Sequence, residues 1–169
     1  MDHTKNFVAH EGVEKLKEMV EKIDICLFCT HLKTDDGSKC RPMSVQKVDD
    51  AGNLWFFSGA DSEKNSDIKA DKKVQLFFSH PAKSSFLVLN GEAEISYDRS
   101  KIDEYWSPLV KTWFKEGKDD PNISLIKVNT NSAYYWDSEG NRMINFFKML
   151  ASVATGTTLV NAEEGSIKV

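Results

Sequence analysis

Three polar residues, Arg41, Ser62 and Lys64, combine chemistry and position in a way that suits the binding of a phosphate group. Arg41 and Pro42 interrupt a segment with the pattern of a central strand, although proline cannot donate to a strand ladder and arginine is costly to bury. Such departures from a local rule often mark sites. Ser62 and Lys64 stand at the predicted start of a helix, where a hydroxyl, an ammonium and free backbone N–H groups can hold a phosphate, with Arg41 as a second contact. Alternatively, Arg41 and Lys64 are surface charges and Ser62 only caps the helix.

Most other kinds of catalytic centre lack their residues in this sequence. The four histidines are scattered, at positions 3, 10, 31 and 80. The motifs HExxH, GxSxG, GxGxxG and GxxxxGK[ST] are absent. We therefore expect no metal centre and no hydrolase triad.

The three cysteines, Cys26, Cys29 and Cys40, are expected to be reduced thiols. Their number is odd, and no secretory context suggests a disulfide framework. Cys26 and Cys29 lie three residues apart in a predicted strand, so their side chains point to opposite faces. Because no second Cys or His pair has ligand spacing, buried apolar packing explains them better than a redox pair or a zinc site.

Length and composition indicate one globular domain. The chain has 169 residues, of which 40% are hydrophobic and 28% charged. A net charge of -4 leaves no basic excess to neutralise backbone phosphates, so a nucleic acid is not an expected partner. No apolar run approaches the roughly 20 residues of a membrane helix, and the N-terminus lacks a signal-peptide pattern. We expect a cytoplasmic protein that makes no membrane contact.

Hydrophobic periodicity predicts the elements of the first half and most of the strands. A helix is predicted over 11–23, where apolar residues recur at helical spacing. A short helix is predicted within 61–70, capped by Asp61 or Ser62. Strands are predicted where apolar and β-branched runs lie between turn sequences. They cover 23–31, 40–48, 54–58, 73–79, 85–90, 91–97, 123–128 and 133–137.

Two more helices are predicted in the second half. Apolar residues after Asp98 repeat at intervals of three and four and predict a helix that ends near Gly117, kinked or restarted at Pro108. A last helix begins near Met143 and stops at Gly156. Residues 1–156 are expected to form one domain, followed by a mobile tail or partner-binding arm at 157–169. These elements predict an α+β, mainly β fold, an antiparallel barrel or sandwich with flanking helices.

Several short motifs, in this order, resemble a known family. They are Arg41-Pro42-Met43-Ser44-Val45-Gln46, Phe57-Ser58, Ser62-x-Lys64, Gly91-Glu92-Ala93-Glu94 and Tyr135-Trp136. Together they resemble the flavin-binding split-barrel superfamily of pyridoxamine 5'-phosphate oxidase. The general stress protein branch is closer still, as indicated by Arg41-Pro42-Met43, Leu54–Ser58, Asp98-Arg99 with Trp106, Trp113-Phe114 with Gly117, and Tyr135-Trp136-Asp137. The resemblance extends from about residue 10 to about residue 150.

The resemblance implies a six-stranded antiparallel split β-barrel that forms a homodimer, with FMN, or alternatively FAD, in a groove at the subunit interface. It places the backbone of residues 41–46 along the flavin ring, with Arg41 toward the phosphate end. Ser62 and Lys64 would bind the phosphate, and Trp136 would pack near the flavin from the partner subunit. The cofactor-binding residues implied are Arg41, Pro42, Met43, Ser44, Gln46, Phe57, Ser58, Ser62, Lys64 and Trp136.

Several positions depart from the oxidase pattern. Glu63 replaces an arginine of the phosphate-binding run, which removes one cation. Gln46 stands where the oxidase has a substrate-contacting lysine, and Phe86 where it has a flavin-contacting glutamine. Farther along, Arg142 is kept, but Ile144 replaces the histidine that contacts the substrate. Because a phosphorylated substrate needs several cations, activity on pyridoxamine 5'-phosphate is not expected.

Three functional hypotheses follow. The leading one is a low-specificity flavin oxidoreductase, in which the cofactor does the redox chemistry and the protein supplies binding and electrostatics. The second is a flavin-binding stress protein without turnover, a reservoir or sensor, which the loss of substrate residues at Gln46 and Ile144 favours. The third is a flavin-free barrel that works through protein contacts, which Glu63 favours. No side chain is predicted as an acid or base.

Overall fold

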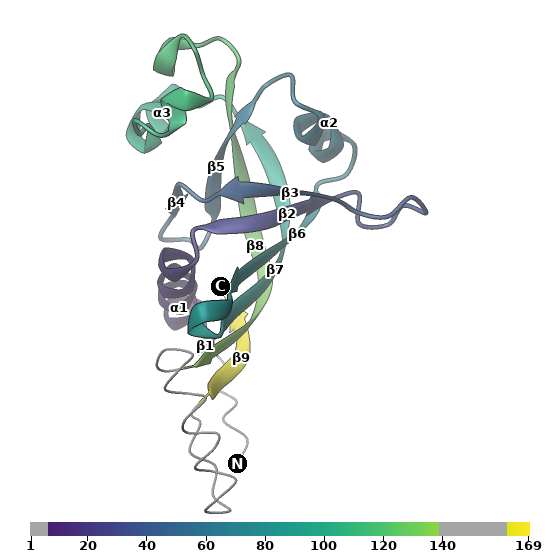
Figure 1. Ribbon diagram of the computed structural model, residues 1–169, viewed down its shortest axis with the longest axis vertical. Coiled ribbons are helices and arrows are strands. Elements are labelled where there is room, and N and C mark those ends of the chain that lie inside the picture. Colours follow the sequence, from purple (N-terminus) through teal and green to yellow (C-terminus); the bar gives the residue numbers. More distant parts are fainter. Residues whose placement is uncertain (1–6, 139–161) are drawn as a thin grey trace, which may run out of the picture.

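The computed structural model describes residues 7–138 and 162–169, which form a mainly β structure with three α-helices (Figure 1). The strands are β1 (Phe7–Val8), β2 (Ile25–Thr30), β3 (Lys39–Ser44), β4 (Lys47–Val48), β5 (Leu54–Gly59), β6 (Lys73–His80), β7 (Ser85–Ser96), β8 (Ile123–Ser138) and β9 (Ala162–Lys168). The helices are α1 (Ala9–Lys22), α2 (Glu63–Ala70) and α3 (Arg99–Tyr105), with 3-10 turns at Pro81–Lys83, Val110–Thr112 and Gly117–Asp119. No helix in these ranges has the length and apolar character needed to cross a bilayer.

The strands close into a split barrel because two stretches of chain change partners. β8 pairs with β7 along nearly its whole length, with β5 through its first half and with β9 through its second half. On the other side, β3 pairs with β2, and the chain then continues into β4, which pairs with β5. Counting β3 and β4 as one position, the order β5-β8-β7-β6-β2-β3/β4 confirms the six-stranded antiparallel barrel. β1 and β9 lie outside it and pair in parallel.

The predicted strand at 40–48 is divided into β3 and β4. The backbone N–H of Val45 donates to Asp24 O at 2.8 Å, and that of Gln46 donates to Trp55 O at 2.9 Å. The backbone thus leaves its ladder with β2 and joins β5 within two residues. This change of partner closes the barrel, and it depends on strands that lie far apart in the sequence.

The interior of the barrel is apolar, and α1 covers one opening. Leu16 and Met19 on α1 are fully buried in one cluster with Phe28 of β2 and Phe56 of β5, whose rings meet edge to face. The helix predicted over 11–23 is confirmed, since its apolar face is the face that packs into the barrel. Burial of such side chains contributes about 1.5–3 kcal/mol each to folding.

A second apolar cluster lies on the outer face of β5 and β8, where α3 and the turns after it pack. It includes Trp55, Leu125 and Phe114. The helix predicted from Asp98 to Gly117 is wrong in its length, because α3 ends at Tyr105. Pro108 has no N–H and disfavours helical backbone in the residue before it, so the chain continues as 3-10 turns instead.

Two pairs of predicted strands are single long strands in the structure. The segments 85–90 and 91–97 form β7, with a register shift at Asn90 and Gly91 instead of a turn. A Cβ at Gly91 would lie 2.5 Å from Asn129 O, so glycine permits the close approach of β8. The segments 123–128 and 133–137 likewise join in β8, because β7 provides the polar residues between them with ladder partners.

The tail predicted at 157–169 is wrong for residues 162–168, which form β9. This strand pairs antiparallel with β8 and parallel with β1. Ile167 is fully buried in the main core, which explains why the segment is ordered against the barrel. The helix predicted to begin near Met143 and residues 157–161 lie outside the described residues, as do Arg142 and Ile144.

The prediction that all three cysteines are reduced is also wrong. Cys29 and Cys40 form a disulfide between directly opposed positions of β2 and β3, with Cα atoms 4.1 Å apart. The pairing depends on strand register, which spacing along the chain does not determine. Cys26 is the free thiol, and burial in the core raises its pKa to about 12. The Cys26 side chain is therefore an unreactive packing residue, as the sequence predicts.

Candidate functional site

The start of α2 is fixed to the end of β5 by a buried polar network. Ser62 caps the helix, and its hydroxyl accepts from the Asn65 N–H at 3.3 Å. Ser58 Oγ donates to Asn65 Oδ1 at 2.7 Å and lies 3.1 Å from Ser62 Oγ. Asn65 in turn donates from Nδ2 to Ser124 Oγ at 2.9 Å. The network holds the first turn of α2, with its unpaired N–H groups, in one orientation at the end of the barrel.

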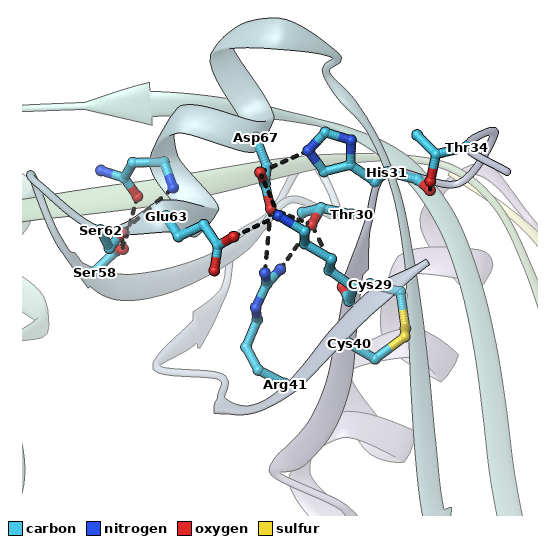
Figure 2. Close-up of polar contacts among 12 residues, drawn as sticks. Cys29, Thr30, His31, Thr34, Cys40, Arg41, Ser58, Ser62, Glu63 and Asp67 are labelled. Atoms are coloured by element: carbon cyan, nitrogen blue, oxygen red, sulfur yellow. Dashed lines mark hydrogen bonds and ion pairs between the residues drawn. A yellow bond between two sulfur atoms is a disulfide. The ribbon is translucent and has the colours of Figure 1, made fainter. Parts of the chain in front are cut away.

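Arg41 is held by a second cluster, centred on the carboxylate of Asp67 (Figure 2). Its guanidinium donates to Thr30 Oγ1 at 2.8 Å and to Asp67 Oδ2 at 3.2 Å. Thr30 Oγ1 itself donates to Asp67 Oδ2 at 2.8 Å, and His31 Nε2 lies 2.6 Å from Oδ1. Thr30, His31 and Arg41 therefore contact one carboxylate that is 6% exposed, and Lys39 Nζ lies 3.9 Å from its Oδ1 atom.

The carboxyl of Asp67 is ionised in this setting. Burial disfavours its charged form, but hydrogen bonds from Thr30, His31 and Arg41 outweigh burial and lower its pKa below the usual value. His31 reaches the carboxylate from the end of β2, where a φ of 54° turns the chain out of the strand. The Arg41 charge is thus neutralised within the protein, and its main role is to fix β3 against α2.

Lys64 has different surroundings. Burial and the nearby charge of Arg41 both lower the pKa of its ammonium group. Glu63 points elsewhere and pairs with Lys39, and within residues 7–138 and 162–169 no carboxylate forms an ion pair with Lys64. Of the three cations here, Arg41 pairs with Asp67 and Lys39 with Glu63, which leaves Lys64 without a counterion.

The arrangement is suited to an anion with several oxygens. The first turn of α2 offers backbone N–H groups, Ser62 a hydroxyl, and Lys64 an ammonium that a bound anion would neutralise. A phosphate satisfies these donors together, because it presents oxygens in three directions and carries the complementary charge.

The other residues implied as flavin contacts, on β3, just after it and on β5, face in several directions. Met43 is buried in the core, so only its backbone is available to a ligand. Pro42 and Ser44 are exposed on the outer face of this edge strand. Gln46 donates to Ser44 O at 3.2 Å and lines a pocket between α1 and β4. Phe57 points away from the barrel and packs against aromatic rings of the second cluster.

Trp136 is remote from these residues within one chain. Ser124 of β8 pairs with Ser58 beside the anion site, and Trp136 lies twelve residues farther along the same strand. At about 3.3 Å per residue the separation is roughly 40 Å. Figure 1 shows the same arrangement, with α2 at one end of the molecule and β9 at the other. A single chain therefore does not bring Trp136 to the site.

Trp136 instead belongs to an exposed apolar face on the outside of the sheet. Leu27 is registered with Phe77, Phe77 with Val88, and Val88 with Tyr134, so one apolar row crosses four strands. Trp136 contacts Tyr134 with ring centroids 4.7 Å apart. Further exposed members of this face are Ile25 and Phe86. Contiguous apolar surface of this kind marks an interaction site.

Sequence reasoning missed Asp67 and its partners Thr30 and His31. Asp67 lies in Glu63–Ala70, a helix whose many polar residues resemble a solvated surface. Asn65 and Ile68 are buried on the same helix, and their spacing of three is the one signal that α2 has an inner face. That Asp67 meets Arg41 on this face is decided by the packing of α2 beside β2.

Comparison with known proteins identifies the family. Residues 11–160 match the family described as pyridoxamine 5'-phosphate oxidase like. The chain belongs to this family. Protein bli-3 of Neurospora crassa is 26% identical over 128 residues, which are 70% of this chain and 60% of that protein. The chain therefore spans about 60% of the length of this curated relative.

Solved structures support the split-barrel fold of this pyridoxamine 5'-phosphate oxidase-like chain. A putative general stress protein 26 from Jannaschia sp. CCS1 superposes with a TM-score of 0.77 at 21% identity and covers 95% of this chain and 100% of its own. A general stress FMN/FAD binding protein from Xanthomonas citri gives a TM-score of 0.64 at 24% identity, with 77% and 90% covered. These neighbours show that the chain shares their fold.

Proposed function

We propose that this protein binds FMN, with FAD as the alternative flavin, and acts as a low-specificity flavin oxidoreductase. The observation that carries the proposal is Lys64, a partly buried cation with no ion-pair partner in the described part of the chain, next to Ser62 at the first turn of α2. Membership of the family, and a structural neighbour described as FMN/FAD binding, support a flavin as the ligand.

The donor set fits the phosphate end of a flavin nucleotide. In the proposed complex, Ser62, Lys64 and the first N–H groups of α2 bind phosphate, while Ser58 fixes Ser62 through the polar network. Arg41, neutralised by Asp67, positions the backbone of β3 for contact with the ring system. The flavin supplies the redox chemistry, and the chain binds it, orients it and shields it from water.

The departures from the oxidase favour a substrate other than pyridoxamine 5'-phosphate. Glu63 adds a negative charge beside the anion site and engages Lys39. Gln46 is uncharged, and Phe86 is an apolar residue on the exposed face. Close to the anion site, few cations of the described residues thus remain for a second phosphate group. A phosphate without ionic partners is costly to remove from water.

The exposed apolar face supports a homodimer. Its row from Leu27 to Tyr134 crosses β2, β6, β7 and β8, so a second copy can cover one continuous surface. Because Trp136 is roughly 40 Å along β8 from its own anion site, it would contribute to a flavin site through the partner subunit.

The dimer can be tested by charge substitution. Phe77→Lys, in the middle of the row, should give a monomer in analytical ultracentrifugation, because an ammonium cannot be buried unpaired in an apolar interface. Leu109→Lys is the control, since Leu109 is 81% exposed near α3 and away from the row. If both variants have the mass of the wild type, this face is not the interface.

Flavin binding can be tested by spectroscopy and titration. Purified protein, loaded with FMN if colourless, should show the flavin absorption bands. Lys64→Ala should weaken FMN binding by about 1.5–3 kcal/mol, the range for a hydrogen bond to a charged group. Lys69→Ala, an exposed cation at the other end of α2, is the matched control. Equal affinities for Lys64→Ala and wild type would remove Lys64 from the site.

Turnover separates the remaining alternatives. Steady-state oxidation of NADH or NADPH by the flavin-loaded protein, with electrons passed to an acceptor, is expected for an oxidoreductase. Bound flavin without such turnover would favour a reservoir or sensor. No binding of either flavin would favour a barrel that works through protein contacts.

A further inference from the structure

The disulfide between Cys29 and Cys40 joins a buried residue to an exposed one. Cys29 is 1% exposed, whereas Cys40 is exposed on β3, the edge strand of the sheet. Figure 2 shows the bridge beside the Arg41 and Asp67 cluster. An attacking thiolate has to reach one of the two sulfur atoms, and the exposed residue Cys40 gives the shorter approach from solvent.

Both cysteines directly precede residues of the polar cluster. Thr30 follows Cys29 on β2, and Arg41 follows Cys40 on β3. The bridge therefore fixes the register that places the Arg41 guanidinium on Thr30 Oγ1 at 2.8 Å. Beyond the bridge, one further registered pair, Thr30 with Lys39, precedes the connecting loop.

Besides the bridge, polar side-chain contacts hold this end of β3: Arg41 contacts Thr30 and Asp67, and Lys39 contacts Glu63. The loop at 31–38 projects away from the barrel (Figure 1), and from residue 33 onward its side chains are exposed. Among the described residues, β3 has β2 as its ladder partner and no strand on its other edge. Without the covalent link, these polar contacts and the ladder with β2 are what oppose local opening of the hairpin end, so it opens more often.

We propose that Cys29 and Cys40 are a redox-active pair that reacts with external dithiols and controls how firmly β3 holds Arg41 beside the anion site. A dithiol thiolate attacks Cys40 Sγ and forms a mixed disulfide, and Cys29 leaves as a thiolate and takes up a proton. The second thiol of the reductant then closes its own disulfide and releases the Cys40 thiol. Two electrons and two protons pass to the protein, and the reductant is oxidised.

The consequence for flavin rests on the proposed function. Reduction loosens the end of β3, which carries Arg41 and Lys39. β3 would then no longer be held in place beside a flavin bound at α2, and the affinity of the protein for the flavin would fall. Reoxidation restores the register and the affinity.

The test uses the full chain in oxidised form and after reduction with dithiothreitol. Alkylation followed by mass spectrometry should label Cys29 and Cys40 in the reduced sample alone. Amide hydrogen exchange over residues 30–41 should be about ten-fold faster on reduction, with α1 unchanged, because the closed loop no longer limits local opening. The dissociation constant for FMN should be several-fold higher for the reduced protein than for the oxidised protein.

Two variants complete the design. The double variant Cys29→Ala with Cys40→Ala should behave as the reduced protein under both conditions. Cys26→Ala, which removes the free thiol of the same strand, should keep the full response to dithiothreitol.

Three results would overturn the proposal. They are labelling of Cys29 and Cys40 without a reductant, equal exchange in the two states, and an exchange difference with unchanged FMN affinity. If neither state binds a flavin, the proposed function fails, while labelling and exchange still decide whether this pair controls β3.

Discussion

The carboxylate of Asp67 offers the sharpest test of how the site is held together. Asp67→Asn keeps the shape of the side chain and removes its charge. Arg41 then loses its counterion, and the hydrogen bonds from Thr30 and His31 meet a neutral amide. The free energy of unfolding should fall for this reason alone, since the backbone and the packing of α2 are unchanged.

The size of the loss follows from the contacts. A hydrogen bond to a charged group contributes about 1.5–3 kcal/mol, and breaking a fully buried ion pair costs about 3–5 kcal/mol. The Arg41 side chain is 23% exposed and can recover part of its hydration, so the lower range applies. We expect a loss of about 2–3 kcal/mol, or a Tm lower by about 4–12 °C for a chain of this size.

The loss of unfolding free energy caused by Asp67→Asn should also depend on pH. The pKa of Asp67 is lower in the folded protein than in the unfolded chain, so its contribution is complete above the unfolded pKa of about 3.9. It disappears as the pH falls through the folded pKa. The difference between wild type and Asp67→Asn should therefore be larger at about pH 5 than below about pH 4, where it narrows.

Urea unfolding, followed by circular dichroism at one fixed protein concentration, measures this difference. Asp103→Asn is the control, because it removes the same charge from an exposed pair with Arg99, which should contribute about 0.5 kcal/mol or less. A loss for Asp67→Asn no larger than that of Asp103→Asn would refute the reasoning. So would a difference that stays constant from pH 7 to pH 3.

Two further substitutions test other parts of the fold. Asp137 accepts from Lys15, which is 8% exposed, at 3.0 Å, from Lys22 at 2.9 Å and from Ser85 at 2.8 Å. Lys15 keeps Glu18 at 3.5 Å and Glu163 at 3.7 Å, so Asp137→Asn should lower the free energy of unfolding in urea by about 1.5–3 kcal/mol. A loss below about 1 kcal/mol would show that the pair is solvated. Gly91→Ala places a Cβ against Asn129 O and should lower the melting temperature through a loss of about 1–3 kcal/mol. An unchanged melting temperature would mean that the bulge in β7 can relax.

Local patterns in the sequence determine much of this protein. The apolar face of α1, the Ser62 cap of α2 and most strand positions follow from periodicity and turn chemistry, which act over a few residues. The ordered motifs predicted the split barrel, and the fold and the family match agree with it. Ser58, Ser62 and Lys64 are near one another in the chain, so their placement around the start of α2 was within reach of sequence reasoning.

The tertiary structure decided the features that depend on strand register. Cys29 opposes Cys40, β3 passes into β4, and β9 joins β8 because particular strands pair, and spacing along the chain does not specify which strands those are. The predicted breaks inside β7 and β8 are absent because the residues there have ladder partners across the β7–β8 pair.

The same holds for the charges at the site. In the sequence, Arg41 and Asp67 are 26 residues apart, and each resembles a surface residue. In the fold they share one buried cluster, which neutralises Arg41, while Lys64 beside them has no ion-pair partner among the described residues. The sequence by itself determined which side chains could bind a phosphate. Only the packing of α2 beside β2 and β3 decided which of their charges is free, because neutralisation depends on distances of a few ångströms between distant segments.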